Sequence, residues 1–485
     1  MNFSYVAYVL RKLYLVYSLV LLPSLVIAVA KETEYVGAFV VGMLVPLGIA
    51  LLLRFCAGRV SWQYSMKESI LVIALGWLSV CFFGAIPYLV SLPQVGVVTA
   101  VFESTSMWTT TGLTALPNLE DLPLSFQVWR IFGHWCGAVG IIVLFSTFLP
   151  KMTRGKEFIL GSELPGRGTE RTLPKIRDSI AVVILTFFAM TLVEFGLLLL
   201  GGLSVLDALN LTVATVGTGG LCFNSSGIMQ FPSTYVALVG LFFMLVGGTN
   251  FSLWFKLWRG DMQAIKEDPE HRYYIGLILL GTAVVSLTLW MQDVYDVADS
   301  LHYGFMMVLS YTSTTGFAFA DVGGWPEGAK LVLLVLLSAG GCSASAAGGF
   351  KIIRCVILTK ALKGELLKIF NPHGVYVVKY GGKAVQTDVV ASVVRFFLLY
   401  LLTSFVLVLA ASFSGLNLID CVSMVASCMS STGSAWGYLG TGAGFAGAGY
   451  YVQGLAIISM LLGRLEITTL LVLLSSDFWG RRKNW

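Results

Sequence analysis

The sequence predicts an all-α polytopic membrane protein. We expect two N-terminal transmembrane helices and then four repeats, each made of a long helix, a short helix and a second long helix. The chain of 485 residues is 57% hydrophobic and only 12% charged, which lies outside the range of soluble globular proteins. It holds about ten apolar stretches near the roughly 20 residues that cross a bilayer core. Four short runs rich in Thr, Ser and Gly recur at a nearly constant spacing.

The apolar stretches follow one another along the whole chain, whose mean hydropathy is +0.83. The predicted spans are 13–30, 36–53, 70–92, 129–149, 178–202, 234–256, 273–292, 329–350, 390–413 and 453–474. The first is not expected to be a cleavable signal, because no small-residue cleavage site follows it and a second span comes at once. We expect an N-terminal helix pair at 1–69 and repeats at 70–176, 177–272, 273–389 and 390–485.

Basic residues are distributed unevenly between the predicted connections. The segments 93–128, 203–233, 293–328 and 414–452 contain no Lys or Arg, whereas the connections 151–177 and 354–395 are basic. Because cytoplasmic loops carry an excess of Lys and Arg, the basic connections and the N-terminus are expected in the cytoplasm. All four Thr/Ser/Gly runs then face outward, on an acidic side that would concentrate cations.

The four runs each follow an apolar segment too short to cross a membrane, at 99–109, 206–215, 299–312 and 418–429. Three of these segments begin near an acidic residue typical of a helix start: Asp207, Asp299 and Asp420. Each is predicted to be a half-helix whose C-terminal dipole end faces a cation. Glycine allows the backbone to turn its carbonyls inward, and Thr and Ser hydroxyls orient them through hydrogen bonds.

Four polar backbone segments that converge on one axis predict a potassium filter, in which carbonyl oxygens replace the water shell of the ion. The final glycines of the runs are 107, 97 and 117 residues apart. The predicted potassium-binding residues are Thr110, Thr111, Gly112, Val216, Gly217, Thr218, Gly219, Thr314, Thr315, Gly316, Ser431, Thr432 and Gly433. The alternative is four ordinary extracellular loops with Thr and Gly as turn formers, but the shared period, side and helix direction favour the filter.

A second glycine-rich segment, from Ala339 to Lys351, lies inside the predicted span 329–350 and is expected to break it. It lacks the strand context and the GK[ST] ending of a phosphate-binding loop. Close helix packing by small residues is an alternative interpretation. We favour a flexible intramembrane loop at 340–349 that obstructs the ion path beneath the filter.

Other polar residues interrupt the apolar spans. Arg464 lies in the last span, where a charge is costly and normally faces a cavity or a partner. Arg464 is expected to brace the structure, to form a salt bridge or to project into the conduction path. The same three alternatives apply to Lys351, after the glycine-rich segment. Glu194 and Asn250 are predicted to be helix–helix hydrogen-bond partners, and His134 is predicted to be an interfacial side chain.

The sequence resembles the Trk/Ktr/HKT superfamily of potassium transporters, and within it the bacterial TrkH/TrkG branch. The segment Gly340 to Lys351, GGCSASAAGGFK, is similar to the gating loop GGCSGSTAGGIK of that branch. The segments MLLGRLEITTLLVL (460–473) and GHWCGAVGIIVL (133–144) resemble its last helix and its first helix after the filter. The two N-terminal spans also match, so the resemblance covers essentially the whole chain.

The resemblance implies one pseudo-fourfold pore formed by four helix–pore helix–helix repeats, with Gly112, Gly219, Gly316 and Gly433 as filter glycines. It implies a gate at 340–349. The gate residues that we predict are Gly340, Gly341, Ser343, Ser345, Gly348, Gly349, Lys351 and Arg464. It also implies a homodimer in the bacterial inner membrane, with a cytosolic nucleotide-binding (TrkA-like) regulatory subunit on the basic connections.

Two departures from the family pattern bear on gating and selectivity. Ala344 and Ala346 replace the usual Gly and Thr of the gating loop, which would alter its flexibility or hydrogen bonding. In the fourth run, Ser430 to Gly437 replaces an Asn-Asn-Leu-Gly-Pro-Gly-like sequence, but Gly433 is kept. Potassium selectivity is therefore expected, with a weaker exclusion of sodium.

The predicted function is potassium uptake through a gated pore, with K⁺ and Rb⁺ as ions and with no bound cofactor, nucleic acid or resident metal besides K⁺. The alternative is a Na⁺- or H⁺-coupled symporter that works by alternating access; such folds commonly use inverted repeats, whereas all four runs here lie on the Lys/Arg-free side. An enzyme is not expected, because the chain shows no nucleophile–base pair and no metal-ligand spacing among its Cys and His residues.

Overall fold

The computed structural model describes residues 1–56, 65–117, 119–152, 173–221, 233–440 and 444–480. Within these ranges the chain is helical apart from one antiparallel ribbon, in which β1 (Lys379–Tyr380) pairs with β2 (Lys383–Ala384). The predicted all-helical, multi-span membrane class is confirmed, and the ribbon is a small addition to it. The basic connection predicted at 151–177 falls largely on 153–172, outside the described residues.

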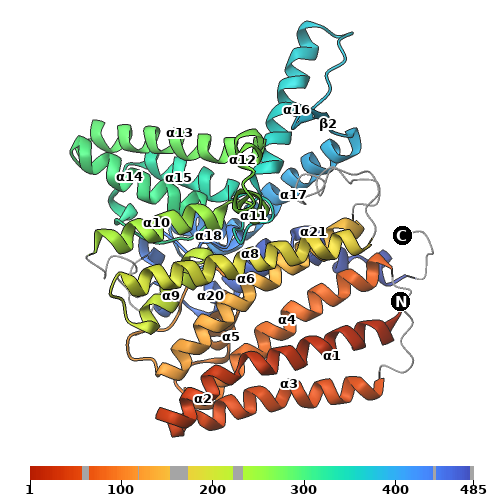
Figure 1. The fold of residues 1–485 in the computed structure, drawn as a ribbon, viewed down its shortest axis with the longest axis vertical. Helices are drawn as coiled ribbons and strands as arrows, with labels where there is room; N and C mark the ends of the chain where they lie inside the picture. The colour runs from red at the N-terminus through yellow and green to blue at the C-terminus, as the bar shows by residue number, and fades with distance from the viewer. Residues whose placement is uncertain (57–64, 118, 153–172, 222–232, 441–443, 481–485) are drawn as a thin grey trace.

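The N-terminal helices form one end of the molecule (Figure 1). α1 (Phe3–Val20) and α2 (Leu22–Lys31) follow one another with little interruption, and η1 (Thr33–Tyr35) leads into α3 (Val36–Cys56). α1 packs against both α3 and α4 (Met66–Ser91). Ser65 and Glu68 begin α4 with a reciprocal capping box, which satisfies amide groups that a helix start leaves free.

Four short helices precede the Thr/Ser/Gly runs, as predicted. They are α5 (Val97–Trp108), α9 (Val205–Val216), α14 (Val297–Thr312) and α18 (Leu418–Ser430). The predicted acids lie in the first turn of their helices, while Ser204, Asp296 and Asn417 occupy the N-cap positions. Each short helix packs against several other helices; α18, for example, packs against the neighbouring α17 and α20 and against α15, which lies farther away in the sequence.

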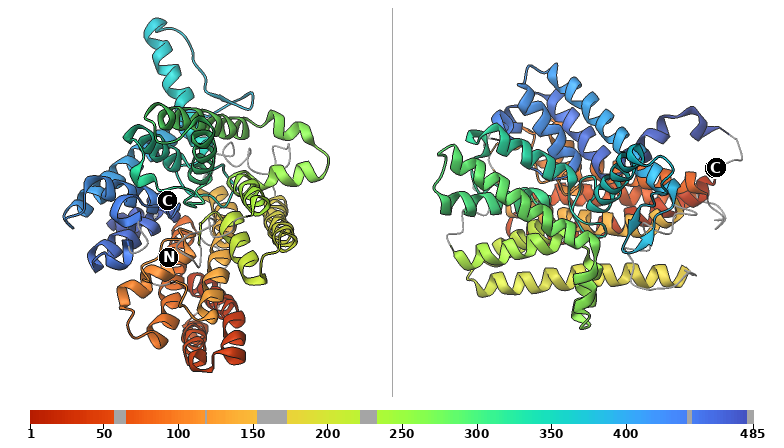
Figure 2. Two further views of the ribbon diagram at one scale, coloured as in Figure 1. Left: turned by 90° about the vertical axis from the view of Figure 1, so that its left-hand side faces the viewer. Right: turned by 90° about the horizontal axis from the view of Figure 1, so that it is seen from above.

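Figure 2 shows the remaining helices from two further directions. Their bounds are α6 (Leu124–Met152), α8 (Leu173–Leu200), α10 (Thr234–Gly248), α11 (Phe251–Trp258), α12 (Met262–Glu267), α13 (Pro269–Met291), α15 (Glu327–Ala339), α16 (Ile352–Phe370), α17 (Thr387–Ser412), α20 (Tyr450–Arg464) and α21 (Ile467–Leu474). Short turns complete the described chain: η3 (Val322–Gly324), η4 (Gly437–Gly440), α19 (Gly444–Gly447) and α22 (Ser476–Trp479).

Two of the predicted spans are wrong as continuous helices. The span 234–256 is divided into α10 and α11, and the span 453–474 into α20 and α21; each pair is bent by 109°. Asn250 caps α11 by accepting from the Ser252 amide, so a new helix starts there in a new direction. Glu466 has a φ of 57°, which no α-helix accommodates. The predicted break after Ala339 is confirmed, because α15 ends at that residue.

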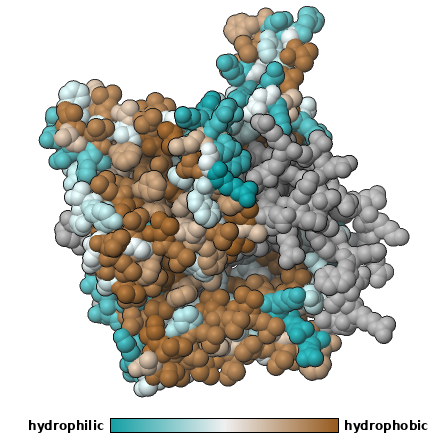
Figure 3. All heavy atoms as spheres, in the orientation of Figure 1, coloured by the Kyte–Doolittle hydropathy of each residue, from teal (hydrophilic) through white to brown (hydrophobic). Residues whose placement is uncertain are grey.

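The face of the helix bundle drawn in Figure 3 is largely apolar where its residues are described. Large side chains such as Leu52, Leu192, Leu280 and Phe405 are exposed. Lipid tails are as apolar as leucine, so this exposure is consistent with a membrane-spanning bundle. α16 and the segment carrying the ribbon extend away from the bundle at one end (Figure 1), and they carry exposed polar residues such as Lys363 and Lys368.

Candidate functional site

Each Thr/Ser/Gly run leaves its short helix in the same backbone conformation. Thr110, Thr218, Thr314 and Ser431 have positive φ angles of 53°, 49°, 56° and 55°, a left-handed conformation that residues other than glycine rarely adopt. In the first run the next two amides, of Thr111 and Gly112, both donate to the carbonyl of Ser106, five and six residues before them. The third run repeats this pattern at Ser310. Residues far apart in the sequence thus have the same backbone conformation and hydrogen bonds, so the positions of the runs can be matched one to one.

These equivalences correct the predicted register of the second run. The amides of Gly219 and Gly220 both donate to the Ala214 carbonyl, as those of the first run do to Ser106. Gly220 has a φ of 55°, whereas the glycines that end the other runs have φ between 75° and 83°. Gly220, not Gly219, is therefore the equivalent of Gly112, and Gly219 takes the position of a threonine. Val216 and Gly217 lie just before the run proper.

The four runs contact one another in a closed cycle, which we call the backbone ring (residues 110–112, 218–220, 314–316 and 431–433). A Cβ atom added to the last glycine of each run would overlap a carbonyl oxygen of the next run. The distances are 1.8 Å from Gly112 to the Gly219 oxygen, 2.3 Å from Gly220 to Thr315, 1.6 Å from Gly316 to Thr432, and 1.8 Å from Gly433 to Thr111. Only a hydrogen fits at these positions, and the fourth contact returns to the first run.

Pairs of hydroxyls support three of the four runs. Thr109 bonds to Thr111 at 2.8 Å, Ser313 to Thr315 at 2.9 Å, and Ser430 to Thr432 at 2.6 Å between hydroxyl oxygens. All six side chains are buried. The second run has Gly217 and Gly219 at the equivalent positions, so no such pair forms there.

His134 of α6 lies against this second run instead. It is fully buried, and a Cβ atom added to Gly219 would lie 2.0 Å from its Cε1 and 2.4 Å from its Nε2. The interfacial location predicted for His134 is therefore wrong. The sequence signal that could have located it is Gly133 and Gly137 on either side, which allow α6 to approach the first run: a Cβ on Gly137 would lie 2.1 Å from the Trp108 oxygen.

Buried carboxylates hold the segments next to the runs. Glu103 of α5 accepts from Arg130 at 2.6 Å, from the Thr114 hydroxyl at 2.9 Å and from the Ala115 amide at 2.5 Å. Both charged side chains are almost fully buried, and ion pairs in that setting need such extra hydrogen bonds. Glu194 of α8 accepts from Thr215 at 2.6 Å, one turn before the second run. The prediction of a helix–helix hydrogen bond for Glu194 is confirmed.

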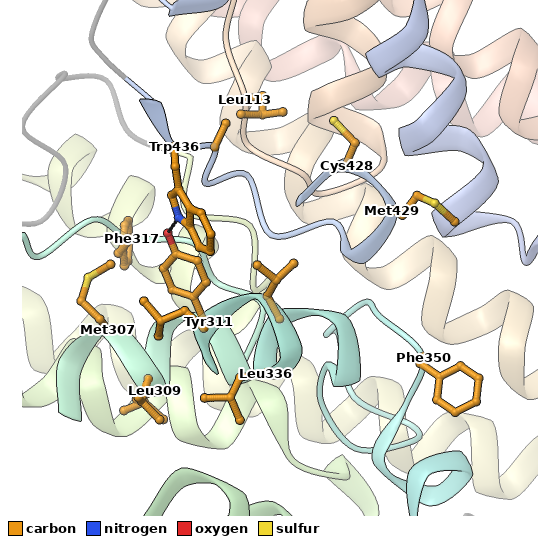
Figure 4. Packing of buried hydrophobic residues seen from close by; sticks show 14 of the residues in the cluster. Leu113, Met307, Leu309, Tyr311, Phe317, Leu336, Phe350, Cys428, Met429 and Trp436 are labelled. Atoms are coloured by element: carbon orange, nitrogen blue, oxygen red, sulfur yellow. Dashed lines mark hydrogen bonds between the residues drawn. The ribbon is translucent and has the colours of Figure 1, made fainter. Parts of the chain in front are cut away.

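Aromatic residues connect the third and fourth runs (Figure 4). The indole of Trp436 donates to the Tyr311 hydroxyl at 2.5 Å, and the same hydroxyl bonds to Ser434 at 2.6 Å. Tyr311 lies on α14, while the other two residues follow the fourth run. A cavity of about 510 Å³ opens beside these residues and is also lined by Gly316, Gly433 and Asp321, so it connects directly with the backbone ring.

The glycine-rich segment forms a loop between α15 and α16, and buried side chains fix its shape. The Glu270 carboxylate accepts from the Ser343 amide at 2.7 Å and from the Ser343 hydroxyl at 2.6 Å. It also accepts from the Ile353 amide at 3.1 Å, at the start of α16. The Lys351 amine donates to the Ala347 carbonyl at 2.5 Å. One acid and one base thus close the loop on itself.

The loop also contacts the backbone ring directly. The Gly348 amide donates to the Thr314 hydroxyl at 2.9 Å, and a Cβ on Gly348 would lie 1.9 Å from the Ser430 oxygen. Arg464 donates to the Ala346 carbonyl at 3.3 Å. Glu466 pairs with Arg354 of α16 and not with Arg464. The structure therefore brings the predicted filter and gate residues together, and Gly220, His134, Glu103 and Glu270 are the site residues that the sequence did not reveal.

Comparisons with known proteins agree with this geometry. A family model described as "TrkH: Cation transport protein" matches residues 39–481. The chain is 30% identical over 463 residues to the Trk system potassium uptake protein TrkH of Salmonella typhimurium, covering 95% of each chain. It is 30% identical to TrkG of Escherichia coli over 475 residues, covering 96% of each. The crystal structure of the potassium transporter TrkH from Vibrio parahaemolyticus superposes with a TM-score of 0.89 at 28% identity, covering 99% of this chain and 100% of that one. The resemblance predicted from the sequence is confirmed.

Proposed function

We propose, from the premise that the chain belongs to the TrkH family of cation transport proteins, that it conducts potassium into the cell through the backbone ring. Membership of this family makes it a transport protein, and the prediction that it is not an enzyme is confirmed. The relatives from Salmonella and Escherichia are named potassium uptake proteins, which supports K⁺ as the ion, with Rb⁺ as a close substitute.

One observation carries the proposal: runs at the C-terminal ends of four short helices contact one another in a closed cycle. A helix C-terminus carries about half a negative elementary charge, and rings of carbonyl oxygens are the ligands of potassium filters. Four such ends around one ring therefore favour a dehydrated cation. The proposed filter is the backbone ring, with Gly220 added to the residues predicted from the sequence. Val216 and Gly217 support it from the end of α9.

The contacts also support four related repeats around one pore, at 70–176, 177–272, 273–389 and 390–485, after an N-terminal helix pair at 1–69. In three of them a glycine of the second long helix approaches the carbonyl four residues before the last glycine of the run. A Cβ on Gly137 would lie 2.1 Å from the Trp108 oxygen and a Cβ on Gly463 2.1 Å from the Met429 oxygen. A Cβ on Gly247 would lie 3.2 Å from the Val216 oxygen, and it would be nearer still, at 2.8 Å, to the oxygen of Thr215. Repetition of one unit predicts such equivalent contacts.

We place the gate at the loop 340–349, with Arg464 as its neighbour. The loop hydrogen-bonds to Thr314 and contacts Ser430, so in this conformation it lies directly against the filter. Its side chains are small, so little bulk would have to be displaced when it moves, and Glu270 and Lys351 define the closed shape. The proposed gate residues are the eight predicted from the sequence.

The membrane arrangement follows the charge pattern. The basic connections and the N-terminus face the cytoplasm of a bacterial inner membrane, and the runs face outward. α16 extends from the bundle with Lys363 and Lys368 exposed, which supports a cytosolic nucleotide-binding regulatory subunit docked there. A homodimer is proposed from the family resemblance. The membrane potential drives uptake, since 100 mV contributes about 2.3 kcal/mol per elementary charge.

Ion-coupled symport remains the second candidate because of Glu194. This carboxyl is fully buried in α8, and its Oε2 atom has no hydrogen-bond partner among the described residues. Intramembrane acids commonly mark proton pathways. At zero membrane potential, an imposed proton gradient that drives K⁺ uptake in the native protein but not in Glu194→Gln would favour symport.

The test of the proposed function is potential-driven flux in liposomes. The purified protein is reconstituted without any partner, and uptake of K⁺, Rb⁺, Na⁺ and Li⁺ is compared. The proposal predicts K⁺ and Rb⁺ fluxes well above those of Na⁺ and Li⁺. Equal fluxes of all four ions would contradict a potassium filter. If no ion passes, Glu270→Gln, which loosens the loop, is expected to release a K⁺-selective flux.

A further inference from the structure

The second run reaches the common backbone conformation without the hydroxyl pair of the other runs. Thr218 has the same left-handed conformation as Thr110, and the following amides make the same hydrogen bonds. Yet Gly217 and Gly219 have no side chains to support it. A strained backbone persists only when its surroundings hold it, so another group must supply that support here.

The imidazole of His134 occupies the space beside both glycines. A Cβ on Gly217 would lie 3.2 Å from its Cδ2 and 3.4 Å from its Nε2, and a Cβ on Gly219 would lie 2.0 Å from its Cε1. The same edge of the ring therefore touches both positions where the other runs carry hydroxyls. Neither ring nitrogen has a hydrogen-bond partner among the described residues, and the backbone of Gly217 is a polar group close to them.

The placement of His134 depends on α6. Gly133 packs against Met107, and Gly137 packs against the Trp108 carbonyl. A Cβ atom added to Gly133 would lie 2.3 Å from the Met107 sulfur, and one added to Gly137 would lie 2.1 Å from the Trp108 oxygen. α6 is therefore pressed against the end of α5, beside the first run, while the residue after Gly133 reaches the second run. One helix thus contacts both the end of α5, next to the first run, and the second run.

We propose that His134 is a positioning residue of the filter, which supports the second run in place of the missing hydroxyl pair. This inference rests on the proposed function of the backbone ring. The imidazole fills the space behind Gly217 and Gly219, and one ring nitrogen makes a polar interaction with the nearby Gly217 backbone. It thereby fixes the Gly219 carbonyl, which contacts Gly112 of the first run. Sites that bind precisely need such support from the residues behind them.

The test compares variants of one position in the reconstituted protein. His134→Gln keeps polar atoms behind the run, His134→Leu keeps bulk without them, and His134→Ala removes both. The K⁺ to Na⁺ flux ratio is expected to fall about fivefold in the Leu and Ala variants, the size of one ordinary hydrogen bond. The Gln variant is expected to keep most of the native ratio. His302→Ala, at an exposed histidine of α14, is the matched control and should leave the ratio unchanged.

Two outcomes overturn the proposal. A native ratio in His134→Leu overturns the proposal, because filling space alone would then suffice. A native ratio in His134→Ala overturns it as well. If the Ala variant does not fold, as judged by size-exclusion chromatography in detergent, the Gln and Leu pair decides the question. A native protein that does not discriminate between K⁺ and Na⁺ would instead refute the proposed function, so the two failures are distinguishable.

Discussion

The second run of the backbone ring and the other three reach the same backbone conformation by different means. Runs one, three and four carry paired hydroxyls, such as Thr109 with Thr111. Run two carries glycines there and has the imidazole of His134 against them. The left-handed residue and the amide hydrogen bonds are nevertheless the same in runs one, two and three. The backbone geometry is thus the common feature. Either a pair of hydroxyls or an imidazole can lie behind it.

The second long helices differ in a related way. α6 is continuous over 29 residues, and it delivers His134 to the second run. α10 and α20 each end one residue after the glycine that touches their own run, at Gly248 and Arg464. In the third repeat the glycine-rich loop takes the place of this helix and contacts the ring itself. An unbroken helix supports the ring, whereas the broken ones lie beside the loop that we propose as the gate.

The largest effect is expected when the ring itself is broken. Gly316→Ser places a side chain where a Cβ would lie 1.6 Å from the Thr432 oxygen, and Gly220→Ser places one 2.3 Å from Thr315. Both also force a positive φ on a residue with a side chain. We expect loss of K⁺ over Na⁺ selectivity, measured as the ratio of liposome fluxes.

The control for the ring glycines is Gly202→Ser. Gly202 also has a positive φ, of 85°, but a Cβ there meets nothing within 4 Å. The Gly202→Ser variant therefore has the same backbone strain without a clash between its side chain and a neighbouring carbonyl. Its K⁺ to Na⁺ flux ratio should equal that of the native protein. A Gly220→Ser protein with native selectivity would show that the second run does not belong to the filter.

A large loss of stability is expected at the ion pair beside the first run. Glu103→Gln leaves Arg130 as an unpaired buried charge, which costs about 3–5 kcal/mol. The second run has no equivalent pair among the described residues, so Glu194→Gln, which keeps a group able to bond Thr215, should cost far less. Thermal unfolding in detergent measures both, and equal melting temperatures for the two variants would contradict this difference.

A moderate effect is expected where the loop meets the third run. Thr314→Val removes the acceptor of the Gly348 amide. An ordinary hydrogen bond contributes about 1 kcal/mol, so the basal K⁺ flux without a partner should rise about fivefold. Thr110→Val, at the equivalent position of the first run, is the control, because no loop amide bonds to Thr110. A Thr314→Val flux equal to that of Thr110→Val would show that this contact does not hold the loop closed.

The smallest effect is expected from the hydroxyl pairs. Thr109→Val removes one of the two hydroxyls behind the first run while keeping the shape of the side chain. We expect the K⁺ to Na⁺ flux ratio to fall about two- to fivefold, as for one weak hydrogen bond. Thr288→Val, on a hydroxyl that bonds only within α13, serves as the reference. No difference between the two would make the hydroxyl pairs dispensable.

Much of this arrangement was predictable because it is local in the sequence. The short helices, the Thr/Ser/Gly runs and the break after Ala339 depend on apolar segment length and on glycine content. The register of the second run was not predictable in this way. Its Thr-Gly-Gly sequence allows either glycine to end the run, and only contacts with the neighbouring runs select Gly220.

The long-range partners were equally inaccessible from the sequence. Glu103 and Arg130 are 27 residues apart, and Glu270 and Ser343 are 73 apart, so nothing local links them. The bends at Asn250 and Glu466 fall within segments that are long and apolar enough to form one continuous transmembrane helix. Segment length and hydropathy alone therefore did not predict the bends. His134 was misplaced because an aromatic neighbourhood is typical of the membrane interface, whereas the flanking glycines draw its helix into the core.

The proposal that the backbone ring binds the transported ion can be tested most directly by locating the ion. Crystals of the protein grown in Rb⁺ in place of K⁺ would be measured at the rubidium absorption edge, and an anomalous difference map calculated. The account predicts a peak enclosed by the carbonyls of Thr111, Gly219, Thr315 and Thr432. A map with rubidium bound elsewhere in the membrane region and none within the ring would contradict it.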